Sequence, residues 1–306
     1  MPSSGDLLAD RRYAYAKSAL DEEDWVAAAD LARQALELAP VFAAAWFLLG
    51  EAFERLGGEE ARRDAVAAYS AALLHDPDDA LGAGLRLALM AKAEPNAAMS
   101  PAYVRSLFDE YAIRFDRHLR GSLAYRAPEL LHDAVRRACS LLLREFRFKE
   151  ALDLGCGTGL AGELFRPECR TLAGTDLSSA MVRKAEAKRL YDELACGDLV
   201  DWLQAREQGR ADLVLAADVF VYLADLAPVF AATARSLRPG GLFAFTVQRH
   251  DGDGVLLGAD QRFAHGEAYL RSLATSASLD PVILDTAATR QERGKDVPGL
   301  LLVLSR

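Results

Sequence analysis

A glycine-rich turn after a short apolar run restricts the fold of this chain more than any other feature of its sequence. The apolar run covers residues 151–154, the turn covers residues 155–159, and a helical pattern follows. Glycine lets the backbone turn tightly and lets a ligand approach without a side chain in the way. The free N–H groups of the next helix favour polar or anionic groups. This order predicts a ligand site at the carboxyl end of a parallel strand.

Short apolar runs alternate with helical patterns from residue 150 to the end of the chain. Alternation of this kind predicts an α/β fold whose parallel sheet is covered on both faces. The last two runs lack a helix between them, so we expect a hairpin with one antiparallel strand at the edge. The seven predicted strands are 150–154, 171–175, 190–195, 211–216, 242–247, 282–286 and 300–304.

The glycine turn is compatible with two kinds of nucleoside ligand. Gly157, Gly159 and Gly162 spell G-x-G-x-x-G, the pattern of a dinucleotide site. Asp153 argues against that reading, because a carboxylate beside the turn would repel a pyrophosphate and would suit a cationic sulfonium. We therefore favour S-adenosylmethionine as the cofactor over a nicotinamide dinucleotide.

An acidic residue also follows each of the next two predicted strands. Asp176 ends the second strand and can accept hydrogen bonds from both ribose hydroxyls. Asp198 follows the third strand and can accept from the adenine amino group, with the N–H of Leu199 near the ring. All three carboxylates are expected at carboxyl strand ends, where open α/β sheets bind ligands. A helix cap is the alternative role for Asp176.

Residues 150–306 resemble the class I S-adenosylmethionine-dependent methyltransferases, which have a Rossmann-like fold. The resemblance implies cofactor binding by Gly155, Gly157, Asp176 and Asp198, with the substrate over the loop after Asp218. The segments that carry it are 152–159, 174–178, 216–223 and 237–241. The cofactor-binding residues expected in addition are Asp153, Cys156, Leu177, Leu199, Asp218 and Tyr111.

Residues 10–95 are alanine-rich and have helical spacing, and they resemble tetratricopeptide repeats. Small residues let paired helices approach while aromatic residues fill the gaps. A generic alanine-rich helical hairpin is the alternative. One unit fits at Trp46, Leu49, Gly50, Phe53, Ala65, Tyr69, Ala72 and Pro77, and an earlier unit fits only at Ala28, Ala32, Ala35 and Pro40. We expect three parts: a repeat-like helical domain (1–95), a helical linker or cap (96–149) and the methyltransferase domain (150–306).

The linker contains a motif that resembles one in a bacterial group of predicted methyltransferases with N-terminal tetratricopeptide repeats. The motif is Tyr-Ala-x2-Phe-Asp-x-His-Leu, and residues 111–119 match it. Tyr111 and Phe115 either close over the cofactor as an aromatic lid or pack the linker onto the catalytic domain.

Methyl transfer is an in-line displacement, so holding the reactants in place does much of the work. A general base is needed only if the acceptor must lose a proton. His118 and His265 are the preferred candidates, ahead of His250, and a structural role is the alternative for each.

The composition and the absence of two motifs restrict the acceptor. The net charge of -9 disfavours nucleic acid as a partner. The loop after the fourth strand lacks the Asn/Asp-Pro-Pro-Tyr motif of amide and adenine N-methyltransferases, and a Pro-Cys nucleophile for cytosine is missing. We expect an oxygen or nitrogen acceptor on a small molecule. The alternatives are a protein methyltransferase whose repeats hold a peptide or partner, and a cofactor-binding interaction protein without catalysis.

Four cysteines without metal-ligand spacing indicate reduced thiols and no metal site. The polar start lacks the apolar segment of a signal peptide, and no apolar run approaches the roughly 18 residues of a membrane span. These features predict a cytoplasmic protein with no membrane partner.

Overall fold

The computed structural model describes residues 2–91, 99–113, 115, 125–292 and 294–306. The chain forms two compact units, Met1–Val104 and Arg105–Arg306. Their boundary falls within helix α6 (Pro101–Tyr111). The finer division at residues 95 and 149 stays a prediction.

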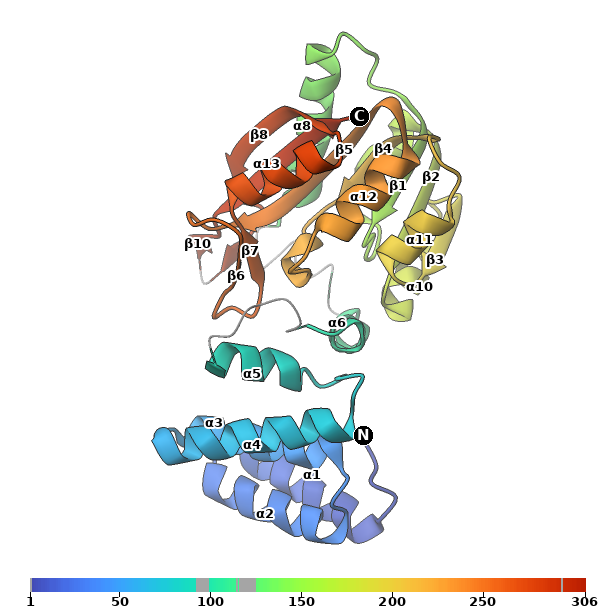
Figure 1. The fold of residues 1–306 in the computed structure, drawn as a ribbon. Helices are drawn as coiled ribbons and strands as arrows, with labels where there is room; N and C mark the ends of the chain where they lie inside the picture. The colour runs from blue at the N-terminus through green and yellow to red at the C-terminus, as the bar shows by residue number, and fades with distance from the viewer. Residues whose placement is uncertain (1, 92–98, 114, 116–124, 293) are drawn as a thin grey trace. The chain divides into compact units, whose positions relative to one another are not determined.

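The first unit consists of helices that pack on their neighbours along the chain (Figure 1). Asp6 begins the first helix by accepting hydrogen bonds from the N–H groups of Leu8 and Ala9. Asp24 begins the second in the same way, through the N–H of Ala27. The helices are α1 (Leu7–Asp21), α2 (Trp25–Leu38), α3 (Ala43–Leu56), α4 (Glu59–His75) and α5 (Ala83–Ala91).

Close contact between α3 and α4 depends on one glycine. A Cβ atom on Gly50 would lie 2.7 Å from the ring of Tyr69, which is completely buried. The Tyr69 hydroxyl donates to Glu54 Oε2 at 2.7 Å, so the buried phenol is satisfied. Gly50 and Tyr69 both belong to the predicted repeat pattern, and this pattern explains the close contact between α3 and α4. Classification as a tetratricopeptide repeat stays a prediction.

The second unit is an α/β domain built on a mostly parallel sheet. Its main strands are β1 (Phe148–Leu154), β2 (Cys169–Asp176), β3 (Glu193–Cys196), β4 (Ala211–Ala216), β5 (Leu237–Arg249), β8 (Asp280–Ala287) and β11 (Gly299–Ser305). Their order across the sheet is β3-β2-β1-β4-β5-β11-β8. Two short strands extend it, β6 (Val255–Leu257) and β7 (Phe263–His265), while β9 (Gln291–Glu292) and β10 (Lys295–Asp296) form a separate pair.

The predicted place of the antiparallel strand was wrong. β11 is antiparallel to both β5 and β8 and lies between them, so β8 forms the edge. The physical reason is burial. Residues 299–304 are buried on both faces, as a central strand requires, whereas β8 is half exposed. The described part of the sheet also has nine strands rather than seven.

Helices cover both faces of this sheet. α11 (Leu199–Ala205), α12 (Ala227–Ser236) and α13 (Glu267–Ser276) lie on one face, and α8 (Ala127–Leu141) and α9 (Leu160–Phe165) on the other (Figure 1). In β5, Phe243 and Phe245 point to the first face, while Leu242 and Ala244 point to the second. α10 (Ser179–Lys188) connects β2 to β3. Among the described helices, none combines the length and apolarity that a membrane span needs.

Replacing Gly50 with alanine should destabilise the helical unit. The added methyl group overlaps the Tyr69 ring and should cost about 1–3 kcal/mol, which the higher helix propensity of alanine offsets by less than about 1 kcal/mol. Urea unfolding followed by circular dichroism measures the change. In a Tyr69→Leu background the same substitution should be neutral or stabilising. An equal loss in both backgrounds would refute the packing argument.

Candidate functional site

The glycine turn after β1 has the backbone conformation that its sequence predicts. Gly155, Gly157 and Gly159 all have positive φ, at 60°, 54° and 88°. A Cβ atom on Gly155 would also lie 2.7 Å from Val219 Cγ2, in the loop after β4. Other residues are strained at such φ values. The turn therefore offers bare backbone at the carboxyl end of β1.

Asp176 connects this turn to the end of β2. Its Oδ2 accepts from the N–H of Gly157 at 2.9 Å, and its Oδ1 accepts from the N–H of Ser178 at 2.8 Å. Burial raises the pKa of this carboxyl, which the two backbone hydrogen bonds counteract. Each oxygen keeps a lone pair for a ligand hydroxyl. Leu177 is the residue between Asp176 and Ser178.

Asp198 lies at the same edge of the sheet. Asp176 at the end of β2 is paired in register with Cys196 at the end of β3. Asp198 follows two residues later and begins α11, where its Oδ1 accepts from the N–H groups of Val200 and Asp201 at 2.7 and 3.1 Å. Leu199 is the first residue of that helix. The structure thus brings Asp176, Asp198 and the turn together.

Asp153 lies beneath the turn and is 1% exposed. The Tyr191 hydroxyl donates to its Oδ2 at 2.6 Å. Burial raises the pKa of Asp153 to about 7, although the Tyr191 hydrogen bond opposes the rise. This geometry favours a buried structural carboxyl over contact with a sulfonium, and the expected cofactor contact stays a prediction.

Tyr191 also accounts for a glycine that suggested a dinucleotide site. A Cβ on Gly162 would lie 2.5 Å from the Tyr191 hydroxyl oxygen, and one on Gly174 would lie 3.0 Å from its ring. The third glycine of G-x-G-x-x-G therefore makes room for a side chain of this protein. The sequence gives no motif for Tyr191, which falls in the predicted strand 190–195 but precedes β3 in the structure.

The loop after β4 is anchored by a buried arginine that sequence reasoning missed. Arg290 is 2% exposed and donates to Asp218 Oδ1 at 3.1 Å and to Gln248 Oε1 at 2.6 Å. The Asp218 N–H donates to Thr246 Oγ1 at 2.9 Å. Asp218 has positive φ, at 59°. An ion pair with Arg290 thus fixes Asp218 in the loop after β4.

The two preferred base candidates have different outcomes. His118 lies outside the described residues. His265 is completely buried, its Nε2 lies 3.0 Å from the carbonyl oxygen of Leu223, and burial lowers its pKa to about 4. A neutral imidazole donating to that carbonyl holds the loop after β4, which favours a structural role. His250 contacts the carbonyl of Gly254 at 3.0 Å.

Aromatic residues of the predicted linker lie at the turn. The Phe115 ring is 3.8 Å from the position of a Cβ on Gly157. It meets the Tyr111 ring edge to face at 5.2 Å between centroids. Packing and closure over a cofactor both fit this contact, and Tyr111 as a cofactor-binding residue stays a prediction.

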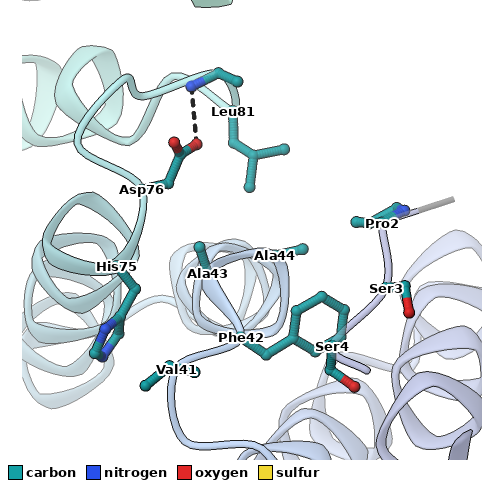
Figure 2. Close-up of a pocket in the computed structure, with 11 residues that line it drawn as sticks. Pro2, Ser3, Ser4, Val41, Phe42, Ala43, Ala44, His75, Asp76 and Leu81 are labelled. Atoms are coloured by element: carbon teal, nitrogen blue, oxygen red, sulfur yellow. Dashed lines mark hydrogen bonds between the residues drawn. The ribbon is translucent and has the colours of Figure 1, made fainter. Parts of the chain in front are cut away.

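The helical unit has a hollow of its own, with a volume of about 480 Å³ (Figure 2). Val41, Phe42 and Leu81 give it apolar walls. Its polar rim includes Asp76, whose Oδ2 accepts from the N–H of Ala80 at 3.0 Å. This surface suits a small apolar group.

The raised pKa of Asp153 predicts a pH-dependent stability. The folded chain holds this proton up to pH 7, whereas the unfolded chain loses it near pH 4, so the folded state is favoured at low pH and loses that advantage as pH rises. Between pH 5 and 8 the loss should be about 3 kcal/mol. Urea unfolding should show that the stability of Asp153→Asn rises relative to that of the wild type by about 3 kcal/mol between pH 5 and pH 8. Exposed Asp201→Asn is the control, and parallel pH profiles for wild type and Asp153→Asn would contradict the prediction.

Comparisons with known proteins agree on the domain. Residues 152–243 match the family model described as a methyltransferase domain. A ubiquinone biosynthesis O-methyltransferase of Cupriavidus pinatubonensis is 31% identical over 110 residues, which cover 33% of this chain and 43% of the relative. A malonyl-(acyl-carrier protein) O-methyltransferase of Chlorobium phaeovibrioides is 30% identical over 148 residues, covering 43% and 54%. The chain spans about half the length of these curated relatives.

A solved structure shares the fold. It is the 1,6-didemethyltoxoflavin N1-methyltransferase of Burkholderia thailandensis, with bound S-adenosylhomocysteine. The TM-score is 0.52 at 17% identity, over 67% of this chain and 88% of that one. Residues 152–243 thus match a methyltransferase domain, and the shared fold and the S-adenosylhomocysteine bound in the solved structure support the predictions of a methyltransferase and of S-adenosylmethionine as its cofactor.

Proposed function

We propose that this chain transfers the methyl group of S-adenosylmethionine to an oxygen or nitrogen atom of a small molecule. The observation that carries the proposal is Asp176, whose two oxygens join the bare-backbone turn to the end of β2. A carboxylate held at that place suits a ribose diol, and the glycines leave room for a nucleoside. The curated O-methyltransferase relative supports a small-molecule acceptor.

S-adenosylmethionine would supply a methyl group bound to a sulfonium sulfur. This sulfur is a good leaving group. The attacking atom forms its bond to the methyl carbon as the carbon–sulfur bond breaks, and the electron pair stays on sulfur. Asp176 would hold the ribose, while Asp198 and the Leu199 N–H would hold the adenine. Gly155 and Cys156 would line the turn. Holding the attacking atom, the methyl carbon and the sulfur in line would then account for most of the rate acceleration.

The acceptor would lie against the loop after β4. Asp218 is paired with Arg290, and this ion pair fixes the loop. Burial raises the pKa of the nearby Tyr125 and Tyr222 phenols, which therefore stay protonated. Deprotonation of an acceptor would fall to His118 or His265 in our proposal, and the buried position of His265 favours His118.

A protein methyltransferase is the second candidate function. The hollow in the helical unit favours it, because apolar walls formed by Val41, Phe42 and Leu81 suit a side chain of a bound peptide. The relative that acts on malonyl-(acyl-carrier protein) supports an acceptor carried on a protein.

Cofactor binding has a direct test in calorimetry with S-adenosylhomocysteine. We expect Asp176→Ala to weaken binding by about 100-fold, because two charge-assisted hydrogen bonds to the ribose are lost. Asp201→Ala removes an exposed carboxylate at the same edge and should bind like the wild type. Wild-type protein that binds no ligand at millimolar concentration would refute the cofactor site.

The acceptor class is tested with a methyl-labelled cofactor in a cell extract. Label in the small-molecule fraction is expected, and it should be lost with Asp176→Ala. Label that enters polypeptide instead would favour the protein methyltransferase. An absence of enzyme-dependent label in both fractions would contradict transfer altogether.

A further inference from the structure

The end of α6 is tied to the beginning of α10 by a single carboxylate oxygen. Asp109 Oδ1 accepts from the Ser178 hydroxyl at 2.6 Å and from the N–H of Ala180 at 3.2 Å. Ser178 is the residue that begins α10, and its hydroxyl also accepts from the N–H of Met181. Asp109 therefore completes the first turn of a helix 69 residues further along the chain.

This contact lies beside the carboxylate proposed to hold the ribose. The N–H of Ser178 donates to Asp176 Oδ1 at 2.8 Å, so a single residue is hydrogen-bonded to both carboxylates. Asp109 is close enough for its charge to oppose ionisation of Asp176, although burial is the larger cause of that raised pKa. A carboxylate placed next to another is costly unless its hydrogen bonds compensate.

The same segment extends across the glycine turn to the loop after β4. Phe108, next to Asp109, meets the Phe115 ring at 6.1 Å and the Tyr222 ring at 5.1 Å between centroids. Phe115 lies against Gly157, and Tyr222 belongs to the 3-10 turn Phe220–Tyr222 after β4. Phe108, Asp109 and Phe115 thus have contacts after the ends of β4, β2 and β1, which surround the proposed cofactor site.

We propose that Asp109 is a positioning residue of the cofactor site. Its two hydrogen bonds hold the end of α6 at the carboxyl ends of the strands, where Phe115 lies against the glycine turn and Phe108 against Tyr222. Cofactor affinity and residence time then depend on a residue that need not touch the cofactor. This inference rests on the proposed function, since it assumes that a nucleoside binds between the turn and Asp176.

Both hydrogen bonds of Asp109 end on Oδ1, so substitutions that keep or remove this oxygen test the positioning role. An amide oxygen can replace Oδ1, so Asp109→Asn should keep both bonds and bind S-adenosylhomocysteine within about threefold of the wild type. Asp109→Ala loses both, and binding should weaken about tenfold, mainly through faster dissociation. Glu110→Ala is the matched control, because Glu110 is an exposed acid on the same helix and should bind normally.

Hydrogen exchange separates this inference from the proposed function. Without any ligand, amides 105–113 should exchange about tenfold faster in Asp109→Ala than in the wild type, Asp109→Asn or Glu110→Ala. A wild type that binds no S-adenosylhomocysteine would overturn the proposed function, while the exchange data would still judge the Asp109 contact. Unchanged exchange in Asp109→Ala, or equal losses of affinity in Asp109→Asn and Asp109→Ala, would overturn the positioning role.

Discussion

Two hydrogen bonds to the Asp176 carboxylate hold the carboxyl end of the sheet in its shape. One comes from the glycine turn after β1, and the other from Ser178 at the beginning of α10. The N–H of Cys156 also donates to the carbonyl of Thr175, which joins the turn to the end of β2 through the backbone. Because Ser178 also contacts Asp109, the same small network reaches the end of α6. The glycine turn, the Asp176 carboxylate and the end of α6 are therefore joined in one hydrogen-bonded network.

Buried charges in this domain are compensated in two different ways. Asp153 accepts a hydrogen bond from the Tyr191 phenol, and burial raises its pKa to about 7, so the folded state favours the neutral form below that pH. Arg290 is paired with several carboxylate and amide groups. Burial without enough partners favours the neutral form, whereas a complete set of partners stabilises the ion. The Asp153 arrangement lies next to the glycine turn, and the Arg290 arrangement fixes the loop after β4.

The sequence predicted the parts of the fold that depend on local pattern. Strand and helix periodicity placed all seven main strands, and the glycines of the turn required positive φ at Gly155 and Gly157. The prediction of strand order failed for β11, because its place depends on pairing with strands that are distant in the chain. The position of β11 depends on which edge of β5 it meets, and the residues 288–298 between β8 and β11 do not specify it. The continuous apolar run of β11 did carry the relevant signal, since central strands are buried on both faces.

The same contrast divides the candidate site into two halves. The cofactor half consists of backbone and short carboxylates that lie within a few residues of strand ends, so its chemistry appears as motifs. The proposed acceptor half is a loop after β4 that distant residues hold: Thr246 and Arg290 bind Asp218, while His265 contacts Leu223 and Tyr269 binds the N–H of Leu226. These partners lie 28 to 72 residues from the groups they hold. A loop held by partners so distant in the chain has no local motif, which is why the sequence predicts the methyl donor more readily than the acceptor.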